Sequence, residues 1–367
     1  MNVLVAMSGG VDSSVAAALL RDEGHRVTGV TLRLWGGESD TGCCSVADVD
    51  DARRVARALG IDHHVWNLSD RFAEDVVAPF VADHAAGRTP NPCIECNRHV
   101  KFDRLLRRAD ALGFEAVATG HHARVVEASD GTRRIARGVD PAKDQSYVLY
   151  MLGQRVLSRT LLPVGALTKA EVRQVAATLG LPTAGKPDSQ DVCFITRTGG
   201  RASFLAERIT RRPARVVDLS GREVGSVDAP HLVTVGQRRG LGLAGGSDPR
   251  YVVDVDPAAA TVTVGGRAAL DTDGVEVDRV VWADAARGGE LLVQCSAHGE
   301  ARLATVATRD DRPRAVTVRW ARPERRVAPG QSVVFYDGDR VVGGGEACRQ
   351  PVAAAPSPPR TAASSPP

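Results

Sequence analysis

The segment VLVAMSGGVDSS, residues 3–14, decides how the first part of this chain folds. Its first four residues are a short apolar run, which is typical of a buried parallel strand. Gly9 and Gly10 favour a tight turn after that strand. We expect a helix over about 13–23, with Gly24 as its natural stop. A strand, a glycine-rich turn and a helix in this order indicate the start of an α/β domain.

The glycine-rich turn is also suited to hold an anion. Backbone N–H groups of such a turn and the positive end of the helix dipole attract phosphate, and Ser8 and Ser13 add hydroxyl donors. Asp12 is a candidate ligand for a Mg²⁺ ion that bridges phosphates. The segment lacks the lysine of a Walker loop and the G-x-G-x-x-G spacing. It resembles the PP-loop of ATP pyrophosphatases, which implies that ATP is split into AMP and pyrophosphate; an ordinary strand–helix turn is the alternative.

Strand and helix patterns alternate through the first half of the chain. Expected strands lie at 26–32, 63–68 and 114–121, and expected helices at 47–60, 72–86, 100–113 and 168–180. We expect Pro79 to kink or split its helix, and Thr168 and Glu171 to form a capping box. The alternation predicts a doubly wound parallel sheet in an α/β domain over residues 1–203.

After about residue 204 the pattern changes to short β-rich runs separated by Gly, Asp and Pro. These runs lie at 231–236, 251–256, 260–266, 274–282, 290–296, 315–320 and 331–345. The last run should form a hairpin that turns at Asp337 and Gly338. We expect a small central β-rich domain over 204–268, a C-terminal β-barrel over 269–350, and a disordered Pro/Ala/Ser-rich tail over 351–367.

The composition, 43% hydrophobic and 25% charged, is that of an ordinary globular protein. No apolar run is long enough for a transmembrane helix and the N-terminus lacks a secretion signal, so we expect no membrane partner. Seven cysteines without a framework spacing favour the reducing cytoplasm. The net charge of +3 is modest, but base-rich segments at 98–108, 208–215 and 309–326 suit either a polyanion partner or solvated faces.

Two segments carry cysteines in a pattern that suggests chemistry. TPNPCIECNRH, residues 89–99, holds Cys93 and Cys96 in what we expect to be a loop stiffened by two prolines. KPDSQDVCFI, residues 186–195, places Cys193 in another loop. No second C-x-x-C completes a zinc site. The thiols could be catalytic, could close a zinc site together with Cys43 or Cys44, or could hold an iron–sulfur cluster.

Several motifs together make the chain similar to a known family. SGGVDSS, TPNPCIECN, GHHAR (120–124), KDQSYVLY (143–150), KPDSQDVCFI and VGQRRGLGL (235–243) follow one another in this order. With this series the chain resembles the bacterial tRNA-specific 2-thiouridylases over residues 1–347. The resemblance implies that ATP adenylates the carbon-2 oxygen of the wobble uridine. Sulfur from a cysteine persulfide then replaces that oxygen to give 2-thiouridine.

By motif position, the resemblance makes Cys96 the nucleophile and Cys193 the persulfide carrier, with a Cys96–Cys193 disulfide left after turnover. Thiolate reactivity requires a lowered pKa, for which Arg98 and His99 are candidate sources of positive potential. Cys93 stands where some family members have aspartate, which leaves its role open. It contacts the target base, is a spare thiol, or ligates iron.

The other cysteines carry less information. Cys43 and Cys44 are either buried, reduced thiols or parts of a sulfur relay or metal site. We expect Cys295 and Cys348, in the β half, to be inert thiols.

The remaining site residues carry over from the family motifs in two groups. Implied contacts to ATP are Ala6, Met7, Ser8, Gly9, Gly10, Val11, Asp12, Ser13, Leu32 and Gly120. Implied contacts to tRNA are Asn91, Pro92 and Cys93 around the target base, then His121, Lys143, Asp144 and Gln145, and finally Arg319, Trp320 and Gln331 in the barrel. The alternatives are a satisfied surface histidine for His121 and a barrel-core aromatic for Trp320.

The resemblance also implies partners: tRNAs for lysine, glutamate and glutamine, and a cysteine desulfurase or sulfur-relay protein. ATP would act with Mg²⁺. One rival interpretation is another PP-loop enzyme, such as an amidotransferase-type ligase, an argininosuccinate synthase relative or a cytidine-modifying tRNA enzyme. Ligases do not need the pair Cys96 and Cys193. A second rival is a zinc or iron–sulfur binding module, and a third is a cluster-assisted version of the same thiolation.

Overall fold

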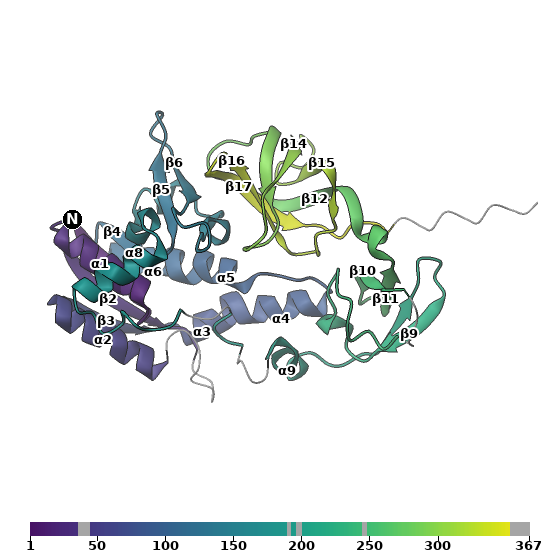
Figure 1. The fold of residues 1–367 in the computed structure, drawn as a ribbon, viewed down its shortest axis with the longest axis horizontal. Coiled ribbons are helices and arrows are strands. Elements are labelled where there is room, and N and C mark those ends of the chain that lie inside the picture. Colours follow the sequence, from purple (N-terminus) through teal and green to yellow (C-terminus); the bar gives the residue numbers. More distant parts are fainter. Residues whose placement is uncertain (36–44, 189–191, 196–199, 244–247, 353–367) are drawn as a thin grey trace, which may run out of the picture.

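The computed structural model describes residues 1–35, 45–188, 192–195, 200–243 and 248–352. Cys43, Cys44 and the tail from residue 353 onward therefore lie outside the described residues. Three β-sheets organise the rest (Figure 1).

A five-stranded sheet forms the first of these units. Its order is β3-β2-β1-β4-β7, and all its pairs are parallel. The strands are β1 (Asn2–Ala6), β2 (Arg26–Arg33), β3 (Asp62–Asn67), β4 (Ala116–Thr119) and β7 (Thr160–Leu161). The expected strands of the first half are thereby confirmed, because short β-branched runs suit a sheet that is buried on both faces.

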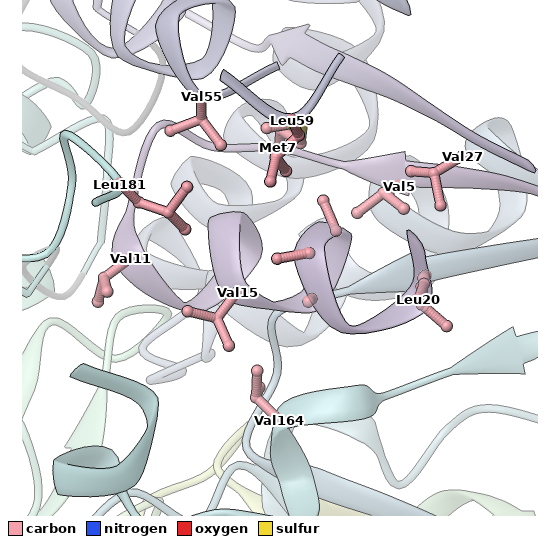
Figure 2. Packing of buried hydrophobic residues seen from close by; sticks show 14 of the residues in the cluster. Val5, Met7, Val11, Val15, Leu20, Val27, Val55, Leu59, Val164 and Leu181 are labelled. Carbon is pink, nitrogen blue, oxygen red and sulfur yellow. The ribbon is translucent and has the colours of Figure 1, made fainter. Parts of the chain in front are cut away.

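Both faces of this sheet are covered, as β1 illustrates. Val3 and Val5 belong to one core and Leu4 to the other, and all three are fully buried. Helices α1 (Val11–Asp22), α2 (Val46–Leu59) and α8 (Lys169–Thr178) supply residues to the first core, part of which Figure 2 shows around Val15. The second core includes residues of α3 (Ser69–Phe72), η1 (Ala73–Val77), α4 (Ala78–Ala85), η2 (Cys96–Arg104) and α6 (Leu105–Ala111). The prediction of a doubly wound α/β fold is confirmed.

The helix that contains Pro79 differs from the expectation in detail. Helical structure runs without a break from α3 through η1 to α4, and the irregular part is the π-helical turn Ala73–Val77 before the proline. Proline has no N–H to donate to the preceding turn, and a π-helical turn is one way to absorb that loss without ending the helix.

The prediction that Cys93 and Cys96 lie in a loop is wrong. Helix α5 (Pro92–Glu95) contains Cys93, and Cys96 begins η2, which continues into α6. Asn91 caps this helix because its side-chain oxygen accepts the Cys93 N–H at 3.0 Å, and Pro92 occupies the first helical position. Asparagine before proline is a typical helix start as well as a turn signal.

A four-stranded sheet follows helix α9 (Gly200–Ala206). It has the order β10-β11-β8-β9, with β8 (Ala214–Val217), β9 (Glu223–Val227), β10 (Tyr251–Asp256) and β11 (Thr261–Gly265). The expected strand at 231–236 is wrong, since Pro230–Leu232 forms a 3₁₀ turn (η5) and residues 233–236 are irregular. Pro230 removes a ladder N–H and Gly236 has a φ of +88°, so both ends of that run disfavour a strand.

The last six strands close into an antiparallel barrel, as expected. They are β12 (Asp271–Trp282), β13 (Gly289–Gln294), β14 (Arg302–Thr308), β15 (Val316–Arg325), β16 (Ser332–Asp337) and β17 (Arg340–Ala347), and β12 closes the ring by pairing with both β15 and β17. The final hairpin turns one residue later than expected: Asp337 pairs with Arg340, so Gly338, at φ +61°, is the first turn residue.

The barrel is joined to the first domain by a hairpin that the sequence did not predict. Strands β5 (Ala123–Glu127) and β6 (Arg133–Arg137) extend the barrel sheet through a pair between Ala136 and Arg340 of β17. Tyr147 donates to the Ser332 carbonyl at 2.8 Å inside the shared core. The remaining elements are η3 (Ser146–Leu149), α7 (Gln154–Leu157), η4 (Pro163–Ala166) and η6 (Arg267–Leu270). Within the described ranges, no helix has the length and apolar character that crossing a membrane requires.

Candidate active site

A cavity of about 400 Å³ lies where β1 and β4 end. The residues after β1, from Ala6 onward, and the residues after β4, from Thr119 to His122, both line it. Strands β2 and β4 flank β1, and the helices that lead into them, α1 before β2 and α6 before β4, pack on opposite faces of the sheet. Such a switch point at the carboxyl ends of parallel strands is where α/β folds bind ligands.

Most of the residues predicted for the site share this one cavity. Among the lining residues are Ala6, Met7, Ser8, Gly10, Val11, Asp12, Ser13, Leu32, Pro92, Cys93, Cys96, Gly120, His121, Lys143, Asp144, Gln145 and Cys193. Gly9, Asn91, Arg319, Trp320 and Gln331 are not among them. The structure thus brings the nucleotide loop and the three motif cysteines together, and leaves the barrel residues elsewhere.

The loop between β1 and α1 is held by its own hydroxyl groups. Ser13 Oγ accepts the Ser8 N–H at 3.2 Å and lies 3.1 Å from the Gly10 carbonyl, to which it donates. Gly10 is the N-cap of α1 and has no side chain to accept hydrogen bonds from the N–H groups of the first turn. An anion can therefore approach the start of α1 directly. Gly9 is glycine for a separate reason: at φ +73°, a Cβ there would lie 2.2 Å from the Asp48 carbonyl oxygen.

Asp12 is the acidic group of this loop, and it is held by two partners. Lys169 Nζ lies 2.7 and 2.8 Å from its two carboxylate oxygens, and His122 Nε2 lies 3.0 Å from one of them. Burial acts to raise the pKa of Asp12, but the hydrogen bonds from His122 and Lys169 outweigh it and hold the pKa below its usual value. Asp12 is therefore an ionised carboxylate at the cavity wall.

Asp188 is a second carboxylate at the cavity, surrounded by cations. Lys143 Nζ lies 2.7 Å from it, Lys169 Nζ 2.9 Å and an Arg173 nitrogen 2.8 Å. Burial acts to raise its pKa, but the hydrogen bonds from Lys143 and Lys169 lower it well below the usual range. Lys143 and Lys169 thus place two ammonium groups at this wall beside Asp12 and Asp188, and ammonium groups are suitable partners for a phosphate ligand.

The cysteines differ in burial. Cys96 is 5% exposed and belongs to the core on the second face of the sheet, against which the half-buried Cys193 packs. Cys93 is also half-buried. Arg98 and His99, expected to supply positive potential, lie 3.7 and 3.2 Å from Glu95, whose carboxylate offsets part of the potential from Arg98.

His121 is not a surface histidine, so that alternative is wrong. It is 8% exposed, lines the cavity, and its Nδ1 lies 2.7 Å from Thr119 Oγ1. Burial, with Lys101 as the next cause, lowers the pKa of His121 to about 3. The imidazole is therefore neutral at physiological pH and offers shape and hydrogen bonding rather than charge.

Lys143, Asp144 and Gln145 are already engaged inside the protein. Asp144 accepts hydrogen bonds from the Arg137 guanidinium, from the Ser146 hydroxyl and from two backbone N–H groups. Gln145 accepts the His122 N–H at 2.8 Å, and Lys143 pairs with Asp188. Asp144 therefore stabilises the turn that presents its two neighbours to the cavity.

The three barrel residues lie on or near the strands β15 and β16. Arg319 is exposed, whereas Trp320 is half-buried and packs against the barrel core. The Trp320 indole N–H is buried and has no hydrogen-bond partner among the described residues. The packing of Trp320 agrees with the barrel-core alternative.

The described cysteines do not form a ready-made metal site. In the part of the chain that the structure describes, no group of three or more His, Cys, Asp or Glu residues is arranged to hold a metal ion. Cys295 is half-buried in the β half, and burial raises the pKa of its thiol to about 12.

Sequence reasoning missed Lys169, His122 and Asp188 as site residues. Lys169 offered a signal: it occupies the first position of α8, where a positive charge opposes the helix dipole. A lysine at that position needs a compensating partner, and Asp12 and Asp188 provide it. The other two gave no signal beyond belonging to motifs, because their partners are distant in sequence.

Three family descriptions match consecutive parts of the chain. They are tRNA methyl transferase HUP domain at residues 1–197, tRNA methyl transferase PRC-barrel domain at 202–266, and Aminomethyltransferase beta-barrel domain at 272–346. The tRNA-specific 2-thiouridylase MnmA of Chloroflexus aurantiacus is 49% identical over 364 residues, which cover 96% of this chain and 99% of the relative. That of Frankia casuarinae is 50% identical over 354 residues, which cover 94% and 98%.

Solved structures resemble the chain more weakly. A 4-thiouridine synthetase in complex with RNA and bound ATP is 19% identical, with a TM-score of 0.36 over 53% of this chain and 44% of that one. A likeness of this size carries no conclusion about the site.

Proposed function

The chain belongs to the tRNA-specific 2-thiouridylase family, and we propose that Cys96 and Cys193 carry out its sulfur transfer beside the nucleotide loop. The family's reaction is the 2-thiolation of tRNA, with ATP as a substrate of the PP-loop domain. This makes the protein a tRNA-uridine 2-sulfurtransferase. The observation that carries the proposal is that one cavity is lined by both thiols and by residues of the nucleotide loop.

ATP would occupy the loop between β1 and α1. The N–H groups at the start of α1 and the ammonium groups of Lys143 and Lys169 would face its phosphates, and Gly120 and Leu32 line the same cavity. Asp12 supplies the kind of ligand that Mg²⁺ prefers, an ionised carboxylate next to phosphate. Bound there, Mg²⁺ would neutralise phosphate charge, and it would take the place of one of the two contacts that Lys169 makes with Asp12.

The activated base is the first intermediate. The carbon-2 oxygen of the wobble uridine attacks the α-phosphate of ATP, so that pyrophosphate leaves and the oxygen carries AMP. Oxide is a poor leaving group, whereas AMP leaves readily when sulfur attacks carbon 2. A single-stranded loop allows the base to unstack and enter a pocket.

Burial favours Cys193 as the carrier and Cys96 as the second thiol. The half-buried Cys193 can receive sulfur from an external donor, whereas Cys96 is almost completely buried. The terminal sulfur of the Cys193 persulfide forms the bond to carbon 2 as AMP leaves, and the Cys96 thiolate then attacks the Cys193 sulfur. Alternatively, Cys96 attacks first and releases hydrosulfide. In both routes the sulfane sulfur gains two electrons, the two thiols lose them as a disulfide, and a thiol reductant restores the enzyme.

Other parts of the proposal follow from family membership. The tRNA substrates would be those for lysine, glutamate and glutamine, contacted by residues around Asn91, Pro92 and Cys93 and by Arg319, Trp320 and Gln331. A cysteine desulfurase or relay protein would donate sulfur, and the cytoplasm is where tRNA, ATP and reduced thiols meet. We also propose domain limits at 1–203, 204–268 and 269–350, close to the breaks between the three family matches.

A cluster-assisted thiolation is the second candidate, with Cys93 as the additional ligand. Cys93, Cys96 and Cys193 line the cavity together, but they are not arranged as a three-ligand site. The thiol route is therefore preferred.

Single-turnover thiolation of a tRNA transcript tests this proposal, with ATP, persulfidated enzyme and the variants Cys96→Ser, Cys193→Ser and Cys93→Ser. We expect the first two variants to lose at least about 100-fold in rate, in the range typical of removing a nucleophile. Cys93→Ser should retain most of the activity. Full thiolation by Cys193→Ser would reject the role assignment. Loss with Cys93→Ser together with stoichiometric iron would favour the cluster.

A further inference from the structure

His298 is the barrel's contribution to the cavity of the candidate active site. Of the described residues that line the cavity, it alone belongs to the barrel, and all the others lie between residues 6 and 194. Its side chain is exposed although it lines the cavity, so it lies at the mouth rather than in the interior. Neither the sequence motifs nor the sulfur-transfer chemistry assigns this residue a role.

A tight turn with a fixed backbone carries His298. After β13, the Gly299 N–H donates to the Ser296 carbonyl at 3.1 Å and closes the turn. A Cβ at position 299 would lie 2.4 Å from Ser296 Oγ, so the turn suits glycine there. Gln294, buried at the end of β13, donates from its side-chain amide to the same Ser296 carbonyl at 2.9 Å. The position of His298 is therefore set by the backbone of this turn.

Gln294 also links the turn to the first domain. Its side-chain oxygen accepts a hydrogen bond from the Arg137 guanidinium at 2.8 Å, and the same guanidinium donates to Asp144 at 2.8 Å. The guanidinium carbon of Arg137 also lies 4.0 Å from the centre of the Tyr336 ring in the barrel. Asp144 belongs to the turn that lines the cavity from the first domain. Because hydrogen bonds to charged groups are short and geometrically specific, the two turns at the mouth are held in register.

A base that enters the cavity leaves its neighbours at the mouth. The target uridine belongs to a single-stranded loop, and when it unstacks to enter a pocket, the backbone keeps the adjoining nucleotides one step away. Those bases lose a stacking partner and can stack on a flat side chain such as that of histidine. An imidazole on a fixed turn is already placed for this contact, so little ordering is required when the RNA binds.

We propose that His298 stacks on a base that adjoins the target uridine and so holds the loop while the uridine is in the cavity. The inference rests on the proposed function, which places the target base in this cavity. Bases inside a duplex are stacked on each other and offer no free face. The contact therefore favours an unpaired loop, which makes His298 a specificity-determining residue.

Binding of a synthetic anticodon stem–loop with a wobble uridine tests this in the full-length protein, with fluorescence anisotropy as the measurement. His298→Ala should weaken binding about tenfold, in the range expected for the loss of one base stack. His298→Phe keeps a flat ring and should retain most of the affinity. His64→Ala is the matched control, since it removes an exposed histidine of β3 that does not line the cavity, and it should bind like the unaltered protein.

Two further stem–loops identify the partner of His298. In each, the nucleotide on one side of the wobble uridine carries no base. With one of the two, His298→Ala and the unaltered protein should bind equally, because the stacking partner is gone; with the other, the difference between them should remain. The slope of log affinity against log salt should be the same in His298→Ala as in the unaltered protein, since stacking neutralises no phosphate.

Equal binding of the natural stem–loop by His298→Ala and the unaltered protein would overturn the proposal. A loss that persists with both abasic stem–loops would also overturn it, and so would a shallower salt slope in His298→Ala, which would indicate a phosphate contact instead. Full thiolation by Cys193→Ser would reject the sulfur-transfer roles and leave the binding result standing.

Discussion

A methyl group on Gly120, at the end of β4, would lie 2.5 Å from the backbone nitrogen of Ser13 in the first turn of α1. The contact shows why glycine is needed there: strand β4 must approach the start of α1 closely enough for both to line one cavity. The backbone of a helix cannot yield as a flexible side chain would.

Gly120→Ala should therefore separate β4 from α1. We expect a loss of about 1–3 kcal/mol in the free energy of unfolding, as is usual for overpacking, and a raised KM for ATP because the nucleotide loop is displaced. Thermal melting and pyrophosphate release measure the two effects. Gly153→Ala is the control, since a Cβ there meets nothing within 4 Å. Equal behaviour of the two variants would contradict this explanation of Gly120.

Stability should decrease as the pH falls from 7 toward 5. Burial, with Arg201 next, lowers the pKa of His84 to about 4, and burial, with Lys101 next, lowers that of His121 to about 3. Between those values and the unfolded pKa of about 6.5, the unfolded chain binds more protons, so the free energy of unfolding rises with pH and is lost as the pH falls. Each histidine should account for about 1 kcal/mol at pH 5.5.

The measurement is the thermal midpoint at pH 7.5 and at pH 5.5. In His84→Gln the decrease between the two pH values should be smaller than in the unaltered protein, whatever the variant's absolute stability. An unchanged decrease would mean that His84 titrates normally in the folded state.

The sequence predicted the parts of the fold that local patterns determine. The strands of the parallel sheet can be predicted because a strand buried on both faces is a continuous apolar run. In β1, Val3 and Val5 enter one core and Leu4 enters the other. The α8 capping box was found because Thr168 and Glu171 are three residues apart. The hairpin β5–β6 was missed although Asp130 and Gly131 form a turn signal between its strands; its membership in the barrel sheet, through the pair between Ala136 and Arg340, has no local signal.

The site shows the same division. The nucleotide loop and the motif cysteines were recognisable as motifs, whereas the bond between Lys169 and Asp12 joins residues 157 positions apart. Asn91 and Pro92 signal a turn as well as a helix start, so the sequence alone favours a loop for the C-x-x-C pair. The bond from the Cys93 N–H to Asn91 is common to both, and the helical bond from the Cys96 N–H to the Pro92 carbonyl decides for the helix.

Asn91 has a structural role that can be separated from a role in binding the target base. Asn91→Ala removes the cap of α5 and should lower the free energy of unfolding by about 1 kcal/mol. Asn91→Asp keeps an accepting oxygen and should melt like the unaltered protein. If Asn91 also contacts the base, thiolation will decrease in both variants; if it only caps the helix, Asn91→Asp will thiolate normally. Melting curves and single-turnover rates distinguish the two.

Binding of tRNA should depend on salt, and Arg319 should account for part of that dependence. Arg319 is exposed on the barrel and is expected to contact phosphate. In Arg319→Ala, the slope of log affinity against log salt should become shallower by about one. Trp320→Phe should preserve the slope, because the ring packs on the barrel core. An unchanged slope in Arg319→Ala would place the phosphate contacts on other basic residues.

Lys169 should be required for the adenylation step itself. Lys169→Met leaves the Asp12 and Asp188 carboxylates at the cavity wall without their shared cation, and breaking such a partly buried pair is strongly unfavourable. The pKa of Asp12 should rise, since the hydrogen bond from Lys169 helps to lower it. We expect tRNA-dependent pyrophosphate release to fall at least about 100-fold, which corresponds to the loss of one strong charged contact to phosphate. Lys169→Arg keeps the charge but not the geometry of a compact ammonium, and should restore only part of the rate.

Lys186→Met, which removes a cation that does not line the cavity, is the control for Lys169→Met. If Lys169→Met releases pyrophosphate as fast as Lys186→Met, Lys169 does not act on the nucleotide.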